Sequence, residues 1–449
     1  MIPIKITERT LIKASNPPIS TPKVLISNLD LIIGHFQGTI ISIYPAPSSP
    51  FQTIVSTIQS KLPFFLNYLY PYTGRIIADP VSNLSSLICN NHGAEFVVGE
   101  TETPLSSIDF GDMDQSLSLI HLPFALDLPL SLQLVRFGCG GFSLSWGMSH
   151  LLQDGHGIAT IVTAWSNFVL TGTLSEIPNH DRSIFVPRLP LRYNPLLDQE
   201  FTLYKPSELI NVLGTSCLLR KIYRVEAADI DRIRAEASGP IRATRLEAVS
   251  AYVWKLLATA VGALDTTCRL AWIIDGRKRL GPKYNEAMKC YLGNVITYTS
   301  REARVDEIKK QSLMYGAALM REAIEEVSCE ERFEQLVDWM EEHKNAGKWT
   351  ETVGVGLGSP TIVISFMPFR LKQDFGFGDP VLTLPWMRPG RLGSCSLNII
   401  RSHGNDGSLL VTARLWPSLA EVMRQDAEKV FKPVTAESLG FLPATTSRL

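Results

Sequence analysis

The sequence predicts a mixed α/β protein built from two halves, and three observations support this class. The chain has 449 residues, which is too long for one ordinary hydrophobic core. Hydrophobic residues make up 45% and charged residues 19%, the balance of a globular protein. Strand-like and helix-like segments alternate irregularly along the chain. A proline-rich crossover at 178–215 separates an N-terminal half at 1–177 from a C-terminal half at 216–449.

The N-terminal half contains a strand, a turn and a helix in close succession. Residues 131–149 predict a hairpin, and apolar and small polar side chains alternate along its second arm. His150 is therefore expected at the end of a strand. A helix should follow almost at once, because apolar residues recur with helical spacing from residue 158 to residue 165. Residues 52–69 predict a separate, earlier helix.

The C-terminal half restarts this alternation. Thr244 and Glu247 form a capping box, in which each side chain accepts the other residue's backbone amide, and it opens a helix to about Leu257. A buried strand at 270–274 ends at Asp275. The other expected elements are helices at 225–237, 305–343 (one or two) and 417–431, and strands at 361–366, 395–400 and 408–416.

Charge and cysteine usage exclude several classes of function. A net charge of −1 gives no electrostatic case for nucleic acid or an anionic membrane as partner. No apolar run is long enough to span a bilayer. The seven cysteines are scattered and never spaced CxxC, which favours a reducing compartment and argues against a metal site. The cytoplasm is the expected location, with the peroxisome as an alternative through the tripeptide Ser447-Arg448-Leu449.

The segment at 149–157, SHLLQDGHG, carries the strongest candidate chemistry. The His150 imidazole can take a proton at neutral pH, and Asp154 can either orient the ring or hold the turn. The spacing leaves two interpretations open: a general base with a supporting aspartate, or a helix-capping aspartate beside a histidine with no chemical role. His156, in the same turn, is a second candidate for the base.

Other motifs narrow the choice. The sequence has no GxSxG, no GxxxxGK[ST] and no HExxH, so the simplest hydrolase, NTPase and metalloprotease classes are excluded. The GxGxG at 354–358 precedes a strand and does not fit a dinucleotide loop. The DFGFG at 374–378 lacks the other kinase motifs, which leaves a structural loop. Arg277 follows a buried strand and could pair with Asp154 across the halves, or lie in a solvated turn.

Together these motifs resemble those of the plant BAHD acyltransferases, which move an acyl group from coenzyme A to an alcohol or amine. The family's HxxxDG corresponds to residues 150–155, and its DFGWG to residues 374–378, where Phe377 replaces tryptophan. Further family signatures match at 26–30, 69–75, 275–279 and 291–294. The resemblance covers about residues 20–440.

The resemblance implies a monomer of two similar mixed-sheet halves, as in chloramphenicol acetyltransferase, with an active-site channel between them. It implies His150 as general base, acyl-CoA as co-substrate, no permanently bound cofactor, and a small alcohol or amine as partner. Asp154 would be structural and would pair with Arg277. The loop that shapes the coenzyme A entrance would consist of Asp374, Phe375, Gly376, Phe377 and Gly378.

The resemblance also implies substrate-contacting residues. Ser250 and Lys255 are candidates for the wall around the phosphate end of coenzyme A. The candidates for the acceptor pocket are Gly38, Ile40, Ser42 and Phe366. Family members that use shikimate carry hydroxyl side chains and an arginine that the stretches at 36–42 and 365–368 do not match. We therefore expect a neutral, fairly apolar acceptor. The alternatives are a condensation or lyase activity on the same fold, and a non-catalytic small-molecule binding protein.

Overall fold

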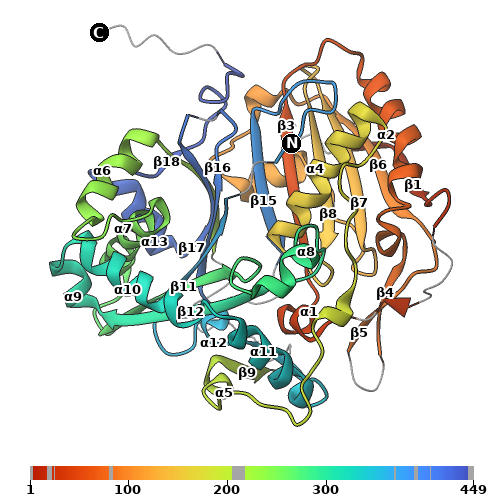
Figure 1. Ribbon diagram of the computed structural model, residues 1–449. Coiled ribbons are helices and arrows are strands. Elements are labelled where there is room, and N and C mark those ends of the chain that lie inside the picture. Colours follow the sequence, from red (N-terminus) through yellow and green to blue (C-terminus); the bar gives the residue numbers. More distant parts are fainter. Residues whose placement is uncertain are drawn as a thin grey trace, which may run out of the picture.

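The computed structural model of the protein describes residues 4–17, 23–24, 26–79, 84–204, 218–368, 371–388, 393–404 and 406–442. Two large sheets stand side by side, and helices cover the outer face of each (Figure 1). This is the mixed α/β class of two halves that the sequence predicts. The tripeptide Ser447-Arg448-Leu449 lies outside the described residues.

The first sheet has six strands in the order β1-β6-β7-β8-β3-β15. The expected hairpin is confirmed, because β7 and β8 pair antiparallel with Leu130 opposite Met148. The helix expected at 52–69 ends earlier, at Phe65. The strands and covering helices are β1 (Lys5–Ile12), β6 (Ala94–Thr101), β7 (Leu130–Phe137), β8 (Phe142–Ser149), β3 (Gln37–Tyr44), β15 (Leu382–Arg388), α2 (Phe51–Phe65) and α4 (Gly155–Thr171).

The second sheet has seven strands in the order β12-β11-β14-β16-β17-β10-β18. The strands are β12 (Ile296–Arg304), β11 (Thr267–Asp275), β14 (Thr361–Met367), β16 (Cys395–Arg401), β17 (Leu409–Leu415), β10 (Leu219–Val225) and β18 (Lys432–Pro433). Its helices are α6 (Ala227–Ala237), α7 (Arg245–Ala260), α9 (Val305–Lys310), α10 (Leu313–Glu326) and α13 (Pro417–Gln425). The capping box at Thr244 and Glu247 is confirmed.

Two expectations for this half need correction. The segment at 305–343 forms three helices, α9, α10 and α11 (Glu330–His343), because extended residues at Gln311 and Cys329 interrupt it. The last helix, α13, ends at Gln425 and not at 431, since Asp426 leaves the helical region with ψ of 117°.

Short elements join the halves. In the described part of the crossover, a 3-10 helix at Arg182–Ile184 is followed by α5 (Leu197–Glu200) and β9 (Phe201–Tyr204), which pairs with β13 (Lys348–Glu351). α1 (Asn28–Ile33) packs against α11. The remaining strands and α-helices of the described residues are β2 (Lys23–Val24), β4 (Arg75–Ala78), β5 (Ser85–Ile88), α3 (Met113–Ser116), α8 (Asn285–Met288) and α12 (Thr352–Val355).

Strand β15 crosses from one half to the other. It comes from the C-terminal half of the chain but pairs antiparallel with β3, from Leu382 opposite Ile43 to Arg388 opposite Gln37. The division of the chain at 178–215 therefore does not separate the two sheets, since residues 382–388 belong to the first sheet.

Among the described residues, apolar side chains form several clusters, three of which involve the two large sheets. One lies between the first sheet and α2 and α4, where Trp146 and Trp165 pack edge to face with their ring centroids 5.9 Å apart. A second lies between the second sheet and its helices. A third joins side chains of both sheets, such as Ile41 of β3 and Ile400 of β16. Among the described helices, none combines the length and the apolar character needed to cross a membrane.

Candidate functional site

A cavity of about 210 Å³ lies where the two sheets meet. Both halves contribute to its wall. The first half supplies Phe36, Gly38, Ile40, His150, Asp154 and His156, and the second sheet supplies Ile273, Val363, Ser365, Ser396 and Asn398. A second cavity adjoins it and shares Ile40, Gly155, Ile158 and Met367 with the first. The first of these cavities reaches His150, and the shared residues place the second beside it.

His150 follows directly on the last residue of β8 and lies in the cavity wall. Its backbone amide donates to the carbonyl of Phe36 at 2.8 Å. Its ring stacks on the Phe36 ring, with the centroids 4.5 Å apart. A methyl group at Gly38 would reach to 4.0 Å from the His150 Cδ2 atom, so the absence of a side chain there keeps space open beside the imidazole.

Asp154 is the N-cap residue of α4. Its Oδ1 accepts from the backbone amides of His156 and Gly157, both at 3.1 Å. Its Oδ2 accepts from Arg277 Nη1 at 2.7 Å and from the Val295 amide at 2.9 Å. A carboxylate at this position satisfies helix-terminal amides and opposes the positive end of the helix dipole. These bonds give Asp154 a structural role in the turn.

The electrostatic balance keeps Asp154 charged although it is buried. Burial alone would raise the pKa of its carboxyl, but the Arg277 guanidinium and the backbone amides lower that pKa below its ordinary value. Burial, together with the nearby Arg277 charge, lowers the pKa of His156, so this imidazole is neutral at pH 7. The turn therefore carries one fixed negative charge, which a buried arginine compensates.

The structure places three of the four expected acceptor-pocket residues in the cavity wall, namely Gly38, Ile40 and Phe366. The structure does not place the fourth residue, Ser42, in that wall. Its side chain is fully buried, donates to Gln373 Oε1 and lies 3.2 Å from the Thr383 hydroxyl. Ser42 has the same strand parity as Ile40, but Gln373 covers its position and the sequence gives no sign of this contact.

Ser250, which is expected to contact coenzyme A, also lies outside the described cavity walls. Ser250 lies on the inner face of α7, is fully buried, and accepts from Trp272 Nε1 at 3.2 Å. Lys255, on the same helix, donates to the carbonyl of Lys309 at 3.4 Å and lies outside the described wall of the cavity. Its contact with the coenzyme stays a prediction.

The DFGFG segment forms a capped loop against the first half. Asp374 Oδ1 accepts from the amides of Gly376 at 2.8 Å and Gly378 at 3.3 Å. Both glycines have positive φ, 87° and 91°, which side chains disfavour. Phe375 is buried in the core beneath α4, and Ser166 of α4 donates to the Asp374 carbonyl. The influence of the DFGFG loop on the coenzyme A entrance stays a prediction.

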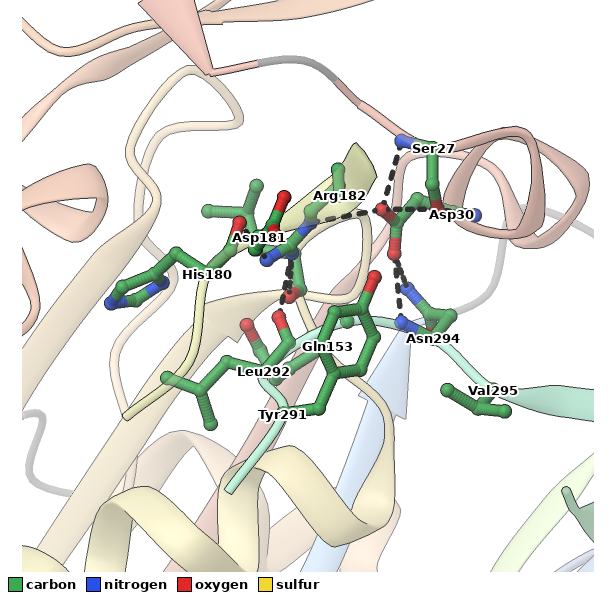
Figure 2. Close-up of polar contacts among 12 residues, drawn as sticks. Ser27, Asp30, Gln153, His180, Asp181, Arg182, Tyr291, Leu292, Asn294 and Val295 are labelled. Carbon is green, nitrogen blue, oxygen red and sulfur yellow. Dashed lines mark hydrogen bonds and ion pairs between the residues drawn. The ribbon is translucent and has the colours of Figure 1, made fainter. Parts of the chain in front are cut away.

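A second buried ion pair, which the sequence analysis did not predict, lies next to residues 149–157, the histidine turn (Figure 2). Asp30 is fully buried, and its Oδ2 lies 3.3 Å from Arg182 Nε. Its Oδ1 accepts from both the amide and the side chain of Asn294 at 2.8 Å. Asp30 and Asn294 belong to family-like signatures, but their pairing is a contact between distant segments. Arg182 carries no local motif, so sequence reasoning missed it.

No group of three or more potential metal ligands occurs among the described histidine, cysteine, aspartate and glutamate residues. The cavity wall contains the imidazoles of His150 and His156, charged side chains such as Asp275 and Arg414, and neutral hydrogen-bonding side chains. Ser365 and Asn398 form one such pair, joined at 2.7 Å, in the wall that the second sheet provides.

The chain is similar to known transferases along nearly its whole length. The model of the Transferase family matches residues 2–430. A shikimate O-hydroxycinnamoyltransferase of Nicotiana tabacum is 26% identical over 434 residues, covering 92% of this chain and 96% of that protein. An omega-hydroxypalmitate O-feruloyl transferase of Arabidopsis thaliana is 26% identical over 401 residues, covering 84% of this chain and 82% of that protein.

The fold is similar to that of a solved structure that contains the coenzyme. TRI101 of F. graminearum, in a crystal structure with coenzyme A and T-2 mycotoxin, superimposes with a TM-score of 0.74. The match covers 92% of this chain and 99% of that one, at 15% sequence identity. At that identity, the likeness concerns the fold of two mixed-sheet halves.

Proposed function

The chain belongs to the Transferase family, that of the BAHD acyltransferases, and from this premise we propose that it moves an acyl group from an acyl-CoA thioester to a neutral, fairly apolar alcohol or amine, with His150 as general base. The observation that carries the proposal is the position of His150. It lies at the end of β8, in the wall of a cavity to which both halves contribute.

The proposed reaction needs one general base, and the acyl group forms no covalent bond with the protein. The His150 imidazole takes the proton of the acceptor's hydroxyl or amine as the acceptor oxygen or nitrogen attacks the thioester carbonyl. The tetrahedral oxyanion collapses, the carbon–sulfur bond breaks, and the leaving thiolate of coenzyme A takes the proton from the imidazolium. Holding both substrates in one cavity supplies much of the rate enhancement.

The composition of the cavity wall supports an apolar acceptor. Its apolar members include Ile33, Ile40, Ile158, Val363, Met367 and Trp386. A site of this kind retains a long or aromatic alcohol, while a polyhydroxylated acid loses its hydrogen-bonding partners in water. One relative is named for the acceptor omega-hydroxypalmitate, which carries a long apolar chain. The relative named for shikimate has the same identity, 26%, so the choice of acceptor rests on the cavity wall.

The test follows the release of free thiol. Purified protein is incubated with acetyl-, benzoyl- or coumaroyl-CoA and with fatty alcohols, aromatic amines or shikimate. We expect acceptor-dependent thiol release with the apolar acceptors and little with shikimate. His150→Ala should lower kcat by about 10³- to 10⁴-fold, the upper part of the range for a general base.

The matched control is His156→Ala, which removes the other imidazole of the same turn. We expect a much smaller loss than for His150→Ala, while the reverse order would assign the base to His156. Full activity in both variants would refute base catalysis by this turn. No acceptor-dependent thiol with any donor would favour a binding protein.

A further inference from the structure

We infer that Asn294 is a positioning residue for the His150 imidazole. It belongs to residues 291–295, called the clamp, whose backbone is bound by two buried ion pairs, Asp30–Arg182 and Asp154–Arg277. The inference rests on the proposed function of His150. It adds a device, drawn from three distant parts of the chain, that fixes where the imidazole lies.

Both ion pairs are almost completely removed from solvent. The side chains of Arg182 and Asp30 are 3% and 0% exposed, and those of Arg277 and Asp154 are 4% and 2% exposed. Buried charges are costly unless their remaining hydrogen-bonding groups are also satisfied. Here the additional partners come mainly from the backbone of residues 291–295 and of the histidine turn.

The two arginines hold three consecutive carbonyl groups of the clamp. Arg182 Nη2 donates to Leu292 at 2.6 Å, while Arg277 Nη2 donates to Tyr291 at 3.3 Å and to Gly293 at 2.7 Å. The carbonyls therefore alternate between the two guanidinium groups. The Arg182 guanidinium also lies over the Tyr291 ring, 5.4 Å from its centroid.

The two aspartates hold the next two amide groups. Asp30 Oδ1 accepts from the Asn294 amide at 2.8 Å, and Asp154 Oδ2 accepts from the Val295 amide at 2.9 Å. Each ion pair therefore binds the clamp through both of its partners. With five successive residues bound in this way, the backbone of 291–295 has little freedom to shift.

Asn294 transmits this rigidity to the histidine. Its side chain is fully buried, and its Nδ2 donates both to Asp30 Oδ1 at 2.8 Å and to the carbonyl of His150 at 2.9 Å. Figure 2 shows Asn294 beside Asp30, with Arg182 on the other side of the carboxylate. Arg182 Nη2 also donates to the Leu152 carbonyl at 2.7 Å, two residues beyond the histidine.

The His150 backbone is thus fixed on both sides. Its amide is bound to Phe36 and its carbonyl to Asn294. A general base must lie within hydrogen-bonding reach of the proton that it abstracts, and a displacement of about 1 Å can cost about 100-fold in rate. Loss of the Asn294 amide frees the His150 carbonyl and permits such a displacement without touching either substrate.

Asn28 provides a matched control for Asn294. It is also a buried asparagine, and its Nδ2 also donates to one carbonyl, that of Val337, and to one carboxylate, that of Glu341, both at 2.9 Å. These bonds tie α1 to α11 and do not involve the histidine turn. Asn28→Ala and Asn294→Ala therefore remove the same kinds of bond at two places.

The experiment compares both variants of the full chain by thermal unfolding and by steady-state kinetics with the donor and acceptor that serve the wild type. We expect both variants to lose stability. Only Asn294→Ala should lose about 100-fold in kcat, with the KM for acyl-CoA changed by less than about twofold, because ground-state binding is untouched. If either alanine variant is insoluble, Asn294→Ser and Asn28→Ser take their place, with the same split expected.

Two outcomes would overturn the inference. One is an equal kcat in the Asn294 and Asn28 variants, and the other is a fall in kcat/KM of the Asn294 variant that comes from a higher KM alone. Failure of the underlying function is distinguishable, because the wild type itself would then release no acceptor-dependent thiol.

Discussion

At the scale of single residues, Asp154 shows how one side chain can satisfy two structural needs at once. One oxygen caps α4, and the other meets Arg277 and the Val295 amide. The HxxxD spacing left open whether Asp154 orients the ring or holds the turn, and its contacts are those of the helix terminus and the ion pair. The His150 imidazole lies in the cavity wall.

Asp154→Asn keeps the shape of the side chain but removes its charge, and Asp275, at 3.1 Å, is then the carboxylate that pairs with Arg277. Disrupting a buried pair typically costs about 3–5 kcal/mol. We expect a loss of about 3 kcal/mol in the free energy of unfolding, measured by urea denaturation, together with lower soluble yield and activity. Wild-type stability and activity in this variant would contradict the structural role of Asp154.

The loss should also depend on pH. The folded-state pKa of Asp154 is lowered, so its contribution to stability is present above the unfolded-state pKa and disappears as the pH falls through the folded-state value. The stability difference between wild type and Asp154→Asn should therefore shrink in acid, which denaturation at pH 7 and at about pH 3 would reveal. A difference that grows in acid would contradict this sign.

At the scale of elements, the DFGFG loop is anchored through one aromatic ring. Phe375 is 2% exposed and packs in the core of the first half, whereas Phe377 is only partly buried. Phe375→Ala should lower the free energy of unfolding by roughly 3 kcal/mol, the lower end of the range for a buried phenylalanine. Phe377→Ala is the control and should cost clearly less. Equal losses, measured by denaturant unfolding, would show that the loop is not anchored at Phe375.

Elements with a local signal were predictable from the sequence. Strand β8 shows twofold alternation, and α7 opens with a capping box that the structure contains. Strand β15 was missed because Pro385 weakens its strand pattern. A proline lacks a backbone donor and is tolerated at the edge of a sheet, and β15 is indeed an edge strand.

The site was predictable to the extent that its residues lie in local motifs. The turn with His150 and Asp154 could be found in this way. Burial could not: helical spacing identifies the inner face of α7, but not that Trp272 occupies the space beside Ser250. Arg182 was missed for a related reason, since its partner Asp30 lies 152 positions away in the chain.

At the scale of the whole molecule, β15 makes the two sheets depend on each other. It covers the edge of β3, and its Pro385 carbonyl accepts from Thr412 of β17 in the second sheet at 3.2 Å. The first sheet is therefore completed by the second half of the chain. An isolated N-terminal half would expose β3, with Ile40, Ile41 and Ile43, as a bare edge.

We therefore expect the fragment 1–177 to aggregate when it is expressed alone. Size-exclusion chromatography of this fragment beside the full chain would test this. Adding a synthetic peptide of residues 380–390, which carries β15, should increase the soluble fraction, and a peptide of the same composition in scrambled order should not. A monomeric, folded fragment without the peptide would contradict the dependence.

The position of β15 between the two sheets has a consequence for how substrates reach the cavity. Because β15 pairs with β3 and also contacts β17 of the second sheet, we expect the two sheets to move little relative to each other when substrates bind. We therefore expect substrates to enter and leave the cavity without a wide opening of the two halves. On this expectation, the cross-section of a substrate limits binding more than its length does.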